Sequence, residues 1–185
     1  MSLYPEVRES NSKSPGLGLI HVYFGQGVGK TTRVVGLAVR AAGAGLKVAF
    51  VQFMKTGDSG EVAIFKKIDN IDYFSPGRHP FVREAGPERV HFDHAAKALE
   101  RAWEAVGQGV DVLICDEILN AVFFKILSPE NILDLIQACR GRVELVLTGA
   151  DARDEIIEAA DYVTQFVQIK HPYYAGVSAR RGLEF

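Results

Sequence analysis

Residues 20–31 read Ile-His-Val-Tyr-Phe-Gly-Gln-Gly-Val-Gly-Lys-Thr, and this stretch decides the fold. An apolar run ends in three alternate glycines, and a Lys-Thr-Thr then opens a helical segment. Glycines let the backbone turn so that several N–H groups face one anion, and the amino end of the following helix faces the same point. The stretch predicts a strand, a phosphate-binding loop (P-loop) and a helix. The alternative is a glycine-rich turn with an ordinary surface lysine.

Within this loop, Lys30 would place its charge on the terminal phosphates of a nucleotide, and the Thr31 hydroxyl would bind Mg²⁺. The pattern departs from the common P-loop motif at one position, because Phe24 stands where that motif has its first glycine. The loop residues that we expect to bind the nucleotide are Gly25, Gln26, Gly27, Val28, Gly29, Lys30, Thr31 and Thr32.

The composition limits the classes of protein to consider. A chain of 185 residues is long enough for one domain with a proper core. A net charge of −2 argues against a general nucleic-acid binder, and no apolar run approaches the roughly 20 residues that span a bilayer. No secretory signal opens the chain, and Cys115 and Cys139 lie in apolar surroundings. We expect buried thiols in a cytoplasmic protein with no membrane partner.

Strands and helices alternate along residues 19–185, which we expect to form one nucleotide-binding domain behind a flexible arm at 1–18. The expected strands are 19–24, 47–53, 71–74, 110–115, 143–147 and 162–169. The expected helices are 31–44, 61–68, about 92–106, one that begins at Ser128 and Pro129, and 153–160. Near-continuous apolar strands separated by helices predict a three-layer α/β domain of the P-loop NTPase-like, RecA-like type with a mostly parallel central sheet.

Two further polar groups belong on the edge of this sheet where the strands end, since ligands of open α/β sheets bind there. The buried strand 110–115 leads into Asp116 and Glu117, whose carboxylates suit Mg²⁺ together with Thr31. The alternative is a strand that ends in two solvated acids. After strand 47–53, Lys55 could contact a phosphate and Glu61 could orient Lys55 or a metal-bound water. A polar loop with a solvated ion pair explains those two residues equally well.

Two irregular segments contain many aromatic and basic residues, as loops that line binding sites often do. The first is the loop 75–89, with His79 and Phe81, and the second is the tail 170–185, with His171 and Tyr173. The loop aromatics could cover a large flat apolar ligand or simply anchor the loop. The tail could line the site, or it could pack on the domain or on a second subunit.

Taken in order, these motifs resemble the P-loop ATP:corrinoid adenosyltransferases, which act on cob(I)alamin or cob(I)yrinic acid a,c-diamide. The resemblance extends from about residue 19 to 185, and the unusual loop and the tail are its most specific parts. Its motifs are Gly-x-Gly-x-Gly-Lys-Thr-Thr (25–32), Val-Gln-Phe-x-Lys (51–55), Gly-Glu (60–61), Asp-Glu (116–117), Leu-Thr-Gly (147–149), Ala-Asp-x-Val-Thr (160–164), Lys-His-Pro-Tyr (170–173) and Ala-Gly-Val-x-Ala-x-x-Gly-Leu-Glu-Phe (175–185).

The resemblance implies transfer of the 5′-deoxyadenosyl group of ATP to the Co(I) of a corrinoid, with release of triphosphate, in adenosylcobalamin biosynthesis or salvage. Co(I) is itself the nucleophile, so the protein needs no general base and acts by positioning and by stabilising charge. The residues implied as catalytic are Lys30, Thr31 and Glu117, with Mg²⁺ held by Thr31, Asp116 and Glu117. Lys55 and Glu61 join the nucleotide-binding set.

The resemblance also implies partners. The family is usually homodimeric, an external electron donor such as a flavoprotein reduces the corrinoid to Co(I), and the N-terminal arm covers the partner subunit's site. Apolar side chains near the corrin favour removal of the lower axial ligand of cobalt. Our candidates for the corrinoid side are Phe74, His79, Phe81, His171 and Tyr173.

The chain departs from the family pattern at four points. Val28 replaces a common lysine, Ala150 a typical arginine and Gln165 a common glutamate, while the only tryptophan, Trp103, lies outside the corrin-side loop. These departures leave open a slower enzyme, a different corrinoid preference, or a paralogue that binds ATP without transfer. The alternatives are therefore a non-catalytic ATP-binding regulator or corrinoid carrier on the same fold, and a small P-loop kinase.

Overall fold

The first strand, the P-loop and the first helix form where the sequence predicts them. The computed structural model describes residues 16–78 and 82–184. In it, β1 spans Ile20–Phe24 and α1 spans Lys30–Gly43. Gly29 precedes α1 with a φ of 102°, a left-handed conformation that favours glycine. The chain therefore turns sharply at Gly29, and the amino end of α1 faces the residues of the P-loop.

The remaining elements continue the alternation of strands and helices. The strands are β2 (Val48–Gln52), β3 (Ile71–Phe74), β4 (Val112–Asp116), β5 (Glu144–Gly149) and β6 (Tyr162–Gln165). The helices are α2 (Gly60–Phe65), α3 (Arg89–Gly107), α4 (Ile118–Phe123), α5 (Pro129–Cys139), α6 (Asp154–Glu158) and the 3₁₀ helix η1 (Pro172–Ala175). Ser128 caps α5 as predicted, since its hydroxyl accepts a hydrogen bond from the Asn131 amide.

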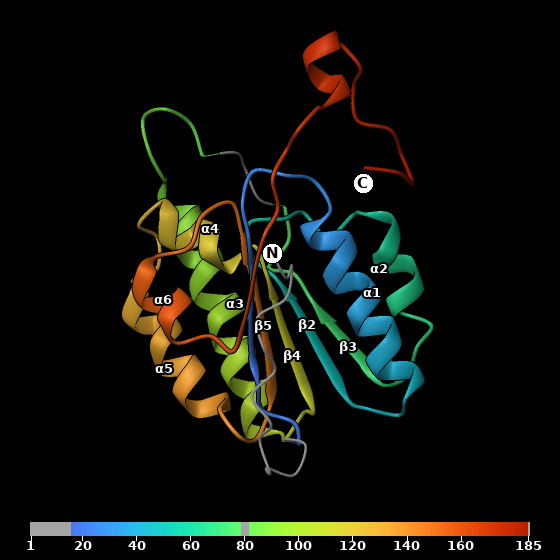
Figure 1. Cartoon of the computed structure of the whole chain (residues 1–185), viewed down its shortest axis with the longest axis vertical. Helices are drawn as coiled ribbons and strands as arrows, with labels where there is room; N and C mark the ends of the chain where they lie inside the picture. Colours follow the sequence, from blue (N-terminus) through green and yellow to red (C-terminus); the bar gives the residue numbers. More distant parts are fainter. Residues whose placement is uncertain (1–15, 79–81, 185) are drawn as a thin grey trace, which may run out of the picture.

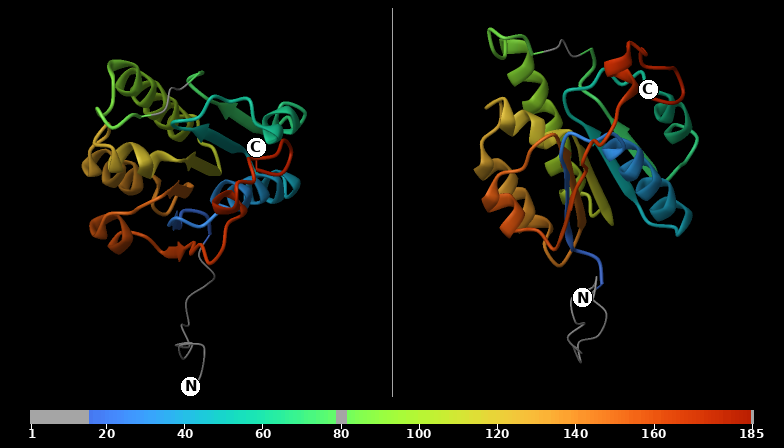
Figure 2. Two further views of the ribbon diagram at one scale, coloured as in Figure 1. Left: turned by 90° about the horizontal axis from the view of Figure 1, so that it is seen from above. Right: turned by 45° about the horizontal axis from the view of Figure 1, so that its top comes forward.

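The six strands form one parallel sheet in the order β3-β2-β4-β5-β1-β6. The chain moves towards one edge from β1 to β3 and then returns towards the other. Because parallel crossovers are right-handed, the helices of the two directions cover opposite faces. Figures 1 and 2 show α1 and α2 on one face and α3 to α6 on the other. The predicted three-layer α/β fold is confirmed.

Each face of the sheet packs an apolar layer. Under α1 and α2, the rings of Phe50 and Phe65 pack with centroids 4.9 Å apart. Under α3, small side chains such as Ala98 and Ala102 let that helix approach the sheet closely. Both cysteines, Cys115 and Cys139, are buried free thiols, as predicted. Within the described residues, no helix combines the length and the apolar character needed to cross a membrane.

The structure differs from the sequence prediction in three places. Helix α4 was not predicted, because most of its side chains are buried and it shows no alternation of apolar and polar positions. The last strand ends at Gln165 instead of at residue 169, since the chain then leaves β1 to cross the P-loop. There the Phe166 amide donates to the Phe24 carbonyl (2.7 Å), and the Phe166 carbonyl accepts from the Gly27 amide (2.8 Å). The tail, predicted to be irregular, contains η1.

Replacement of Gly149 by alanine should destabilise the fold. A Cβ atom at this position would lie 2.5 Å from Leu119 Cβ and 3.0 Å from the Asn120 amide nitrogen, so α4 would have to shift. Overpacking of this kind costs about 1–3 kcal/mol, which urea denaturation would measure. Gly36→Ala is the matched control, because a Cβ in that exposed turn of α1 meets no atom within 4 Å. The control should gain about 0.5–1 kcal/mol. Equal stability of Gly149→Ala and the wild type would contradict this account.

Candidate nucleotide-binding site

The predicted site residues meet at the carboxyl edge of the sheet, beside the point where strands β2 and β4 are neighbours. Helix α2 follows β2 on one face and α4 follows β4 on the other, so the two connections diverge at this edge, which is where ligands of open α/β sheets bind. Helix α1 packs across one face of the sheet against β4, and this packing brings its amino end and the P-loop to the same edge. Three segments far apart in sequence are thus brought together.

The P-loop holds its own lysine. Lys30 Nζ donates to the carbonyl oxygens of Gly25 (2.6 Å) and Gly27 (2.8 Å), so the ammonium group lies inside the curve of the loop. Burial lowers the pKa of Lys30, against the opposing effect of Glu117 and Asp116. No acidic side chain occupies the first turn of α1, so the positive end of the helix keeps its attraction for an anion.

Asp116, at the end of β4, lies at the centre of the site and is fully buried. Its carboxylate accepts hydrogen bonds from the Thr31 hydroxyl (3.2 Å), the Thr148 hydroxyl (2.8 Å) and the Gln52 amide group (3.2 Å). The Lys55 ammonium group lies 3.1 Å from the same carboxylate. A buried charge needs such partners, since removal from water without them costs several kcal/mol. Asp116 therefore ties the P-loop to β2 and β5.

Glu117 turns its carboxylate to the same edge through an unusual backbone conformation. Its φ is 65°, a left-handed value that is uncommon for a residue other than glycine. The Glu117 amide donates to the Thr148 hydroxyl (2.8 Å), and its carboxylate accepts from the Asn120 side chain (3.0 Å). Burial raises the pKa of Glu117, and the neighbouring ammonium group of Lys55 offsets part of that rise.

Lys55 contacts both halves of the site. Its Nζ lies 2.7 Å from Thr31 Oγ1, 3.1 Å from Asp116 Oδ2 and 3.6 Å from Glu117 Oε1. Burial by itself lowers the pKa of Lys55, but the two carboxylates outweigh burial and the pKa is raised. Glu61, which we expect to orient Lys55 or a metal-bound water, accepts a hydrogen bond from the Ser59 hydroxyl (2.6 Å), and its charge adds to the rise in the pKa of Lys55.

A protein-family model described as "ATP:corrinoid adenosyltransferase BtuR/CobO/CobP" matches residues 17–185. This chain belongs to that family. The match covers the P-loop, both carboxylates and the tail, so the resemblance inferred from the motifs is confirmed.

Several curated proteins are similar over most of their length. A corrinoid adenosyltransferase of Pseudomonas aeruginosa is 34% identical over 175 residues, which cover 91% of this chain and 84% of that protein. The corrinoid adenosyltransferase CobA of Salmonella typhimurium is 27% identical over 190 residues, covering 91% and 86%. A corrinoid adenosyltransferase of Escherichia coli is 28% identical over 175 residues, with the same coverage.

Sequence reasoning missed several residues that support the site of this adenosyltransferase. Thr148 and Gln52 lie within quoted motifs, but their contacts with Asp116 depend on strand order. The Tyr73 hydroxyl donates to Gln52 Oε1 (2.7 Å), and burial raises the pKa of Tyr73 to about 12. Asn120 lies on the unpredicted helix α4, where its side-chain oxygen accepts from the Ala150 amide (2.6 Å).

The corrinoid-side candidates within the described residues come from two places, Phe74 at the end of β3 and the neighbouring pair His171 and Tyr173, whose rings lie 6.4 Å apart. Phe74 packs against the apolar layer on the α3 face. His171 and Tyr173 belong to the C-terminal segment, which rises beyond the carboxyl edge on the α1 side (Figures 1 and 2). Tyr173 is 68% exposed. His79 and Phe81 lie outside the described residues.

The departures from the family pattern leave the centre of the site intact. Val28 is 65% exposed on the P-loop, and Trp103 lies on α3. Gln165 is the last residue of β6. Ala150 contributes to the site through its backbone amide, a role that does not depend on its side chain.

Replacement of Thr148 by valine should weaken the site and the fold together. The variant would remove the hydroxyl that donates to Asp116 and accepts from the Glu117 amide, leaving two buried polar groups without this partner. We expect a loss of about 1–3 kcal/mol in the free energy of unfolding, measured by chemical denaturation. Thr148→Ser keeps the hydroxyl and should retain most of the stability. If the valine variant is as stable as the serine variant, the hydroxyl does not support the site.

Proposed function

We propose that this adenosyltransferase transfers the 5′-deoxyadenosyl group of ATP to the Co(I) of a corrinoid, either cobalamin or cobyrinic acid a,c-diamide. The electron pair of Co(I) forms a bond to the 5′ carbon, and the bond from that carbon to oxygen breaks. Triphosphate leaves with the electrons of the broken bond. The observation that carries the proposal is the convergence of the P-loop, Lys55 and the Asp-Glu pair, in a chain of this family.

The protein's part in this reaction is electrostatic. Negative charge develops on the oxygen of the leaving triphosphate, and Lys30 with the amides of residues 25–32 would stabilise it. Such groups need no reorganisation during the reaction, because the fold already holds them in place. No general base is required, since Co(I) brings its own electron pair. The P-loop would also hold the 5′ carbon in line with the cobalt.

The residues at the end of β4 fit Mg²⁺. Within the described residues there is no cluster of three or more His, Cys, Asp or Glu side chains suited to a metal. Mg²⁺ needs no such cluster, because it takes one or two carboxylates together with phosphate oxygens and water. Thr31, Asp116 and Glu117 supply oxygen donors of this kind and would hold the ion. When bound, Mg²⁺ would neutralise part of the triphosphate charge.

We propose that the corrinoid binds beyond the carboxyl edge, between Phe74 and the tail residues His171 and Tyr173, and we retain His79 and Phe81 as candidates from the sequence. We further propose a homodimer in the cytoplasm, with a flavoprotein as electron donor. The C-terminal segment has strongly exposed apolar side chains, such as Ile169 (91% exposed), and this exposure supports a second subunit that covers the segment.

The domain is proposed to span residues 19–185, with 1–18 as an arm over the partner's site. The Gly18 amide donates to Glu144 (2.9 Å), so the chain is attached to the domain at the last residue of this arm.

One experiment separates transfer from the alternatives. The protein is mixed with Mg-ATP and chemically reduced cobalamin, while the visible spectrum and the phosphate products are followed. Transfer gives the spectrum of a cobalt–carbon bond together with triphosphate. A corrinoid carrier would change the spectrum on binding without releasing triphosphate, and a kinase would yield ADP. The exposed Val28, in place of the family's lysine, is the feature that most favours a carrier.

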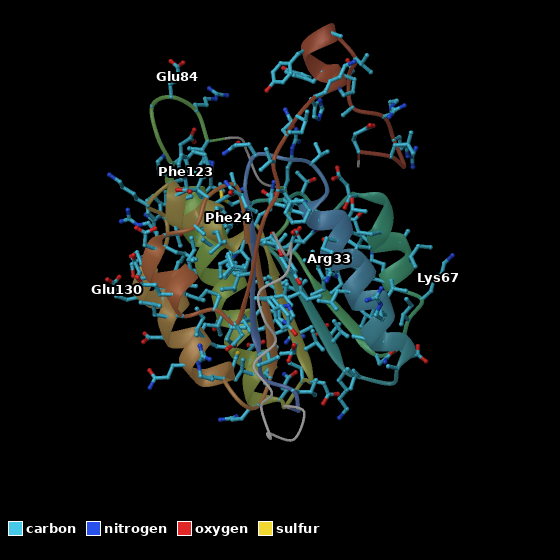
Figure 3. All side chains as sticks on the ribbon, in the orientation of Figure 1. Phe24, Arg33, Lys67, Glu84, Phe123 and Glu130 are labelled. Atoms are coloured by element: carbon cyan, nitrogen blue, oxygen red, sulfur yellow. The ribbon has the colours of Figure 1, made fainter. Side chains whose placement is uncertain are left out.

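Lys30→Ala should abolish transfer while the protein stays folded. The loss of one charged contact with the leaving group should raise the barrier by about 2–4 kcal/mol, which is a fall in rate of about 30- to 900-fold. The rate of triphosphate release measures this effect, and circular dichroism monitors the fold. Lys67→Ala is the control, because Lys67 points away from the body of the protein at the side of α2 (Figure 3). Turnover like that of the wild type in Lys30→Ala would contradict the role given to Lys30.

A further inference from the structure

The ammonium group of Lys55 lies among the oxygen atoms that we assign to the metal. Thr31 Oγ1 is 2.7 Å from Lys55 Nζ, Asp116 Oδ2 is 3.1 Å away and Glu117 Oε1 is 3.6 Å away. These are the hydroxyl and the two carboxylates that would hold Mg²⁺. A cation carried by the chain itself thus occupies the place of the cation that the reaction requires.

Lys55 in this position and a bound metal exclude each other. Mg²⁺ binds its oxygen ligands at about 2.0–2.1 Å, so an ion held by Thr31 and Asp116 would lie only a few ångströms from the Lys55 nitrogen. Two positive charges that close repel strongly in a partly buried site, where water screens them poorly. Asp116 is fully buried and the Lys55 side chain is 26% exposed, so little water could screen the Lys55 charge from a metal ion on Asp116.

The side chain of Lys55 can move while its backbone stays in place. The Lys55 carbonyl accepts from the Ser75 hydroxyl (3.0 Å), and the Phe53 amide donates to the Asp116 carbonyl (2.8 Å), so the loop is anchored to its neighbours. The long side chain has rotatable bonds and ends beside Thr31, which is itself a P-loop residue. A triphosphate bound in the loop would therefore offer new acceptors within reach of the same ammonium group.

We propose that Lys55 is a tethered cation that holds the metal position until the nucleotide arrives. When Mg-ATP binds, Lys55 moves from the carboxylates to the phosphates, and Mg²⁺ takes its place on Asp116. This inference rests on the proposed function, because it assumes a P-loop that binds the triphosphate. Its consequence is that the protein binds a divalent ion tightly only together with the nucleotide. Lys55 thereby acts as a positioning residue that couples metal binding to substrate binding.

Mn²⁺ serves as the probe, since electron paramagnetic resonance measures its binding without any reaction. In the absence of nucleotide, Lys55→Met should bind Mn²⁺ about tenfold or more tightly than the wild type, because it keeps the length of the side chain and removes the charge. Lys67→Met is the control and should match the wild type. If Lys55→Met and the wild type bind Mn²⁺ equally, the proposal is overturned.

A second variant tests whether the ion binds at Asp116. Lys55→Met combined with Asp116→Asn should lose the gained affinity, and retention of that affinity would show that Mn²⁺ binds elsewhere and would overturn the proposal. If Lys55→Met fails the circular dichroism check, Lys55→Gln replaces it in both measurements.

Titrations in the presence of ATP test whether Lys55 moves to the phosphates. In the wild type ATP should raise the affinity for Mn²⁺ strongly, because the phosphates draw Lys55 away from the carboxylates, and in Lys55→Met this factor should be about fivefold or more smaller. An equal factor in the two proteins would show that Lys55 does not couple the metal to the nucleotide, and it would overturn the exchange.

The failure of this inference is distinguishable from failure of the proposed function. A wild-type protein that produces no adenosylated corrinoid refutes transfer, whatever the Mn²⁺ titrations show. Equal Mn²⁺ affinities in a protein that does transfer the adenosyl group refute only the role of Lys55.

Discussion

The buried negative charge of Asp116 is the constraint on which the rest of the site depends. A carboxylate with no exposed surface must be surrounded by donors and cations, and here they come from four different segments. Thr31 belongs to the start of α1, Gln52 to β2, Lys55 to the loop after β2, and Thr148 to β5. The P-loop and the ends of three strands are therefore held in one arrangement by a single side chain.

The parallel sheet makes this arrangement possible. Parallel strands end at one edge, and the change in direction of the chain after β3 sends the helices that follow β2 and β4 to opposite faces. Polar residues at the strand ends meet at this edge. The apolar layers below it contain few polar groups, so the site is supported by a rigid core.

The P-loop is shaped by the chain that crosses it as well as by its own glycines. A Cβ atom on Gly25 would lie 2.4 Å from the Phe166 carbonyl oxygen, and one on Gly27 would lie 2.8 Å from the Phe166 carbonyl carbon. These two glycines are thus needed to admit the segment after β6. This close approach connects the P-loop to the C-terminal segment, which continues past Phe166 to η1 and the exposed tail.

Local patterns in the sequence determined the P-loop, the class of fold and the position of Asp116, because each depends on residues adjacent in the chain. A glycine loop between a strand and a helix identifies Lys30 and Thr31, and an apolar strand that ends in Asp-Glu identifies the opposite half of the site. Only the tertiary structure decided which groups surround Asp116. The role of Thr148 requires β5 to lie beside β4, and the left-handed turn at Glu117 requires α4, whose apolar residues carry no periodic signal. Strand order and burial are properties of the whole chain, since they follow from how all the apolar faces pack at once.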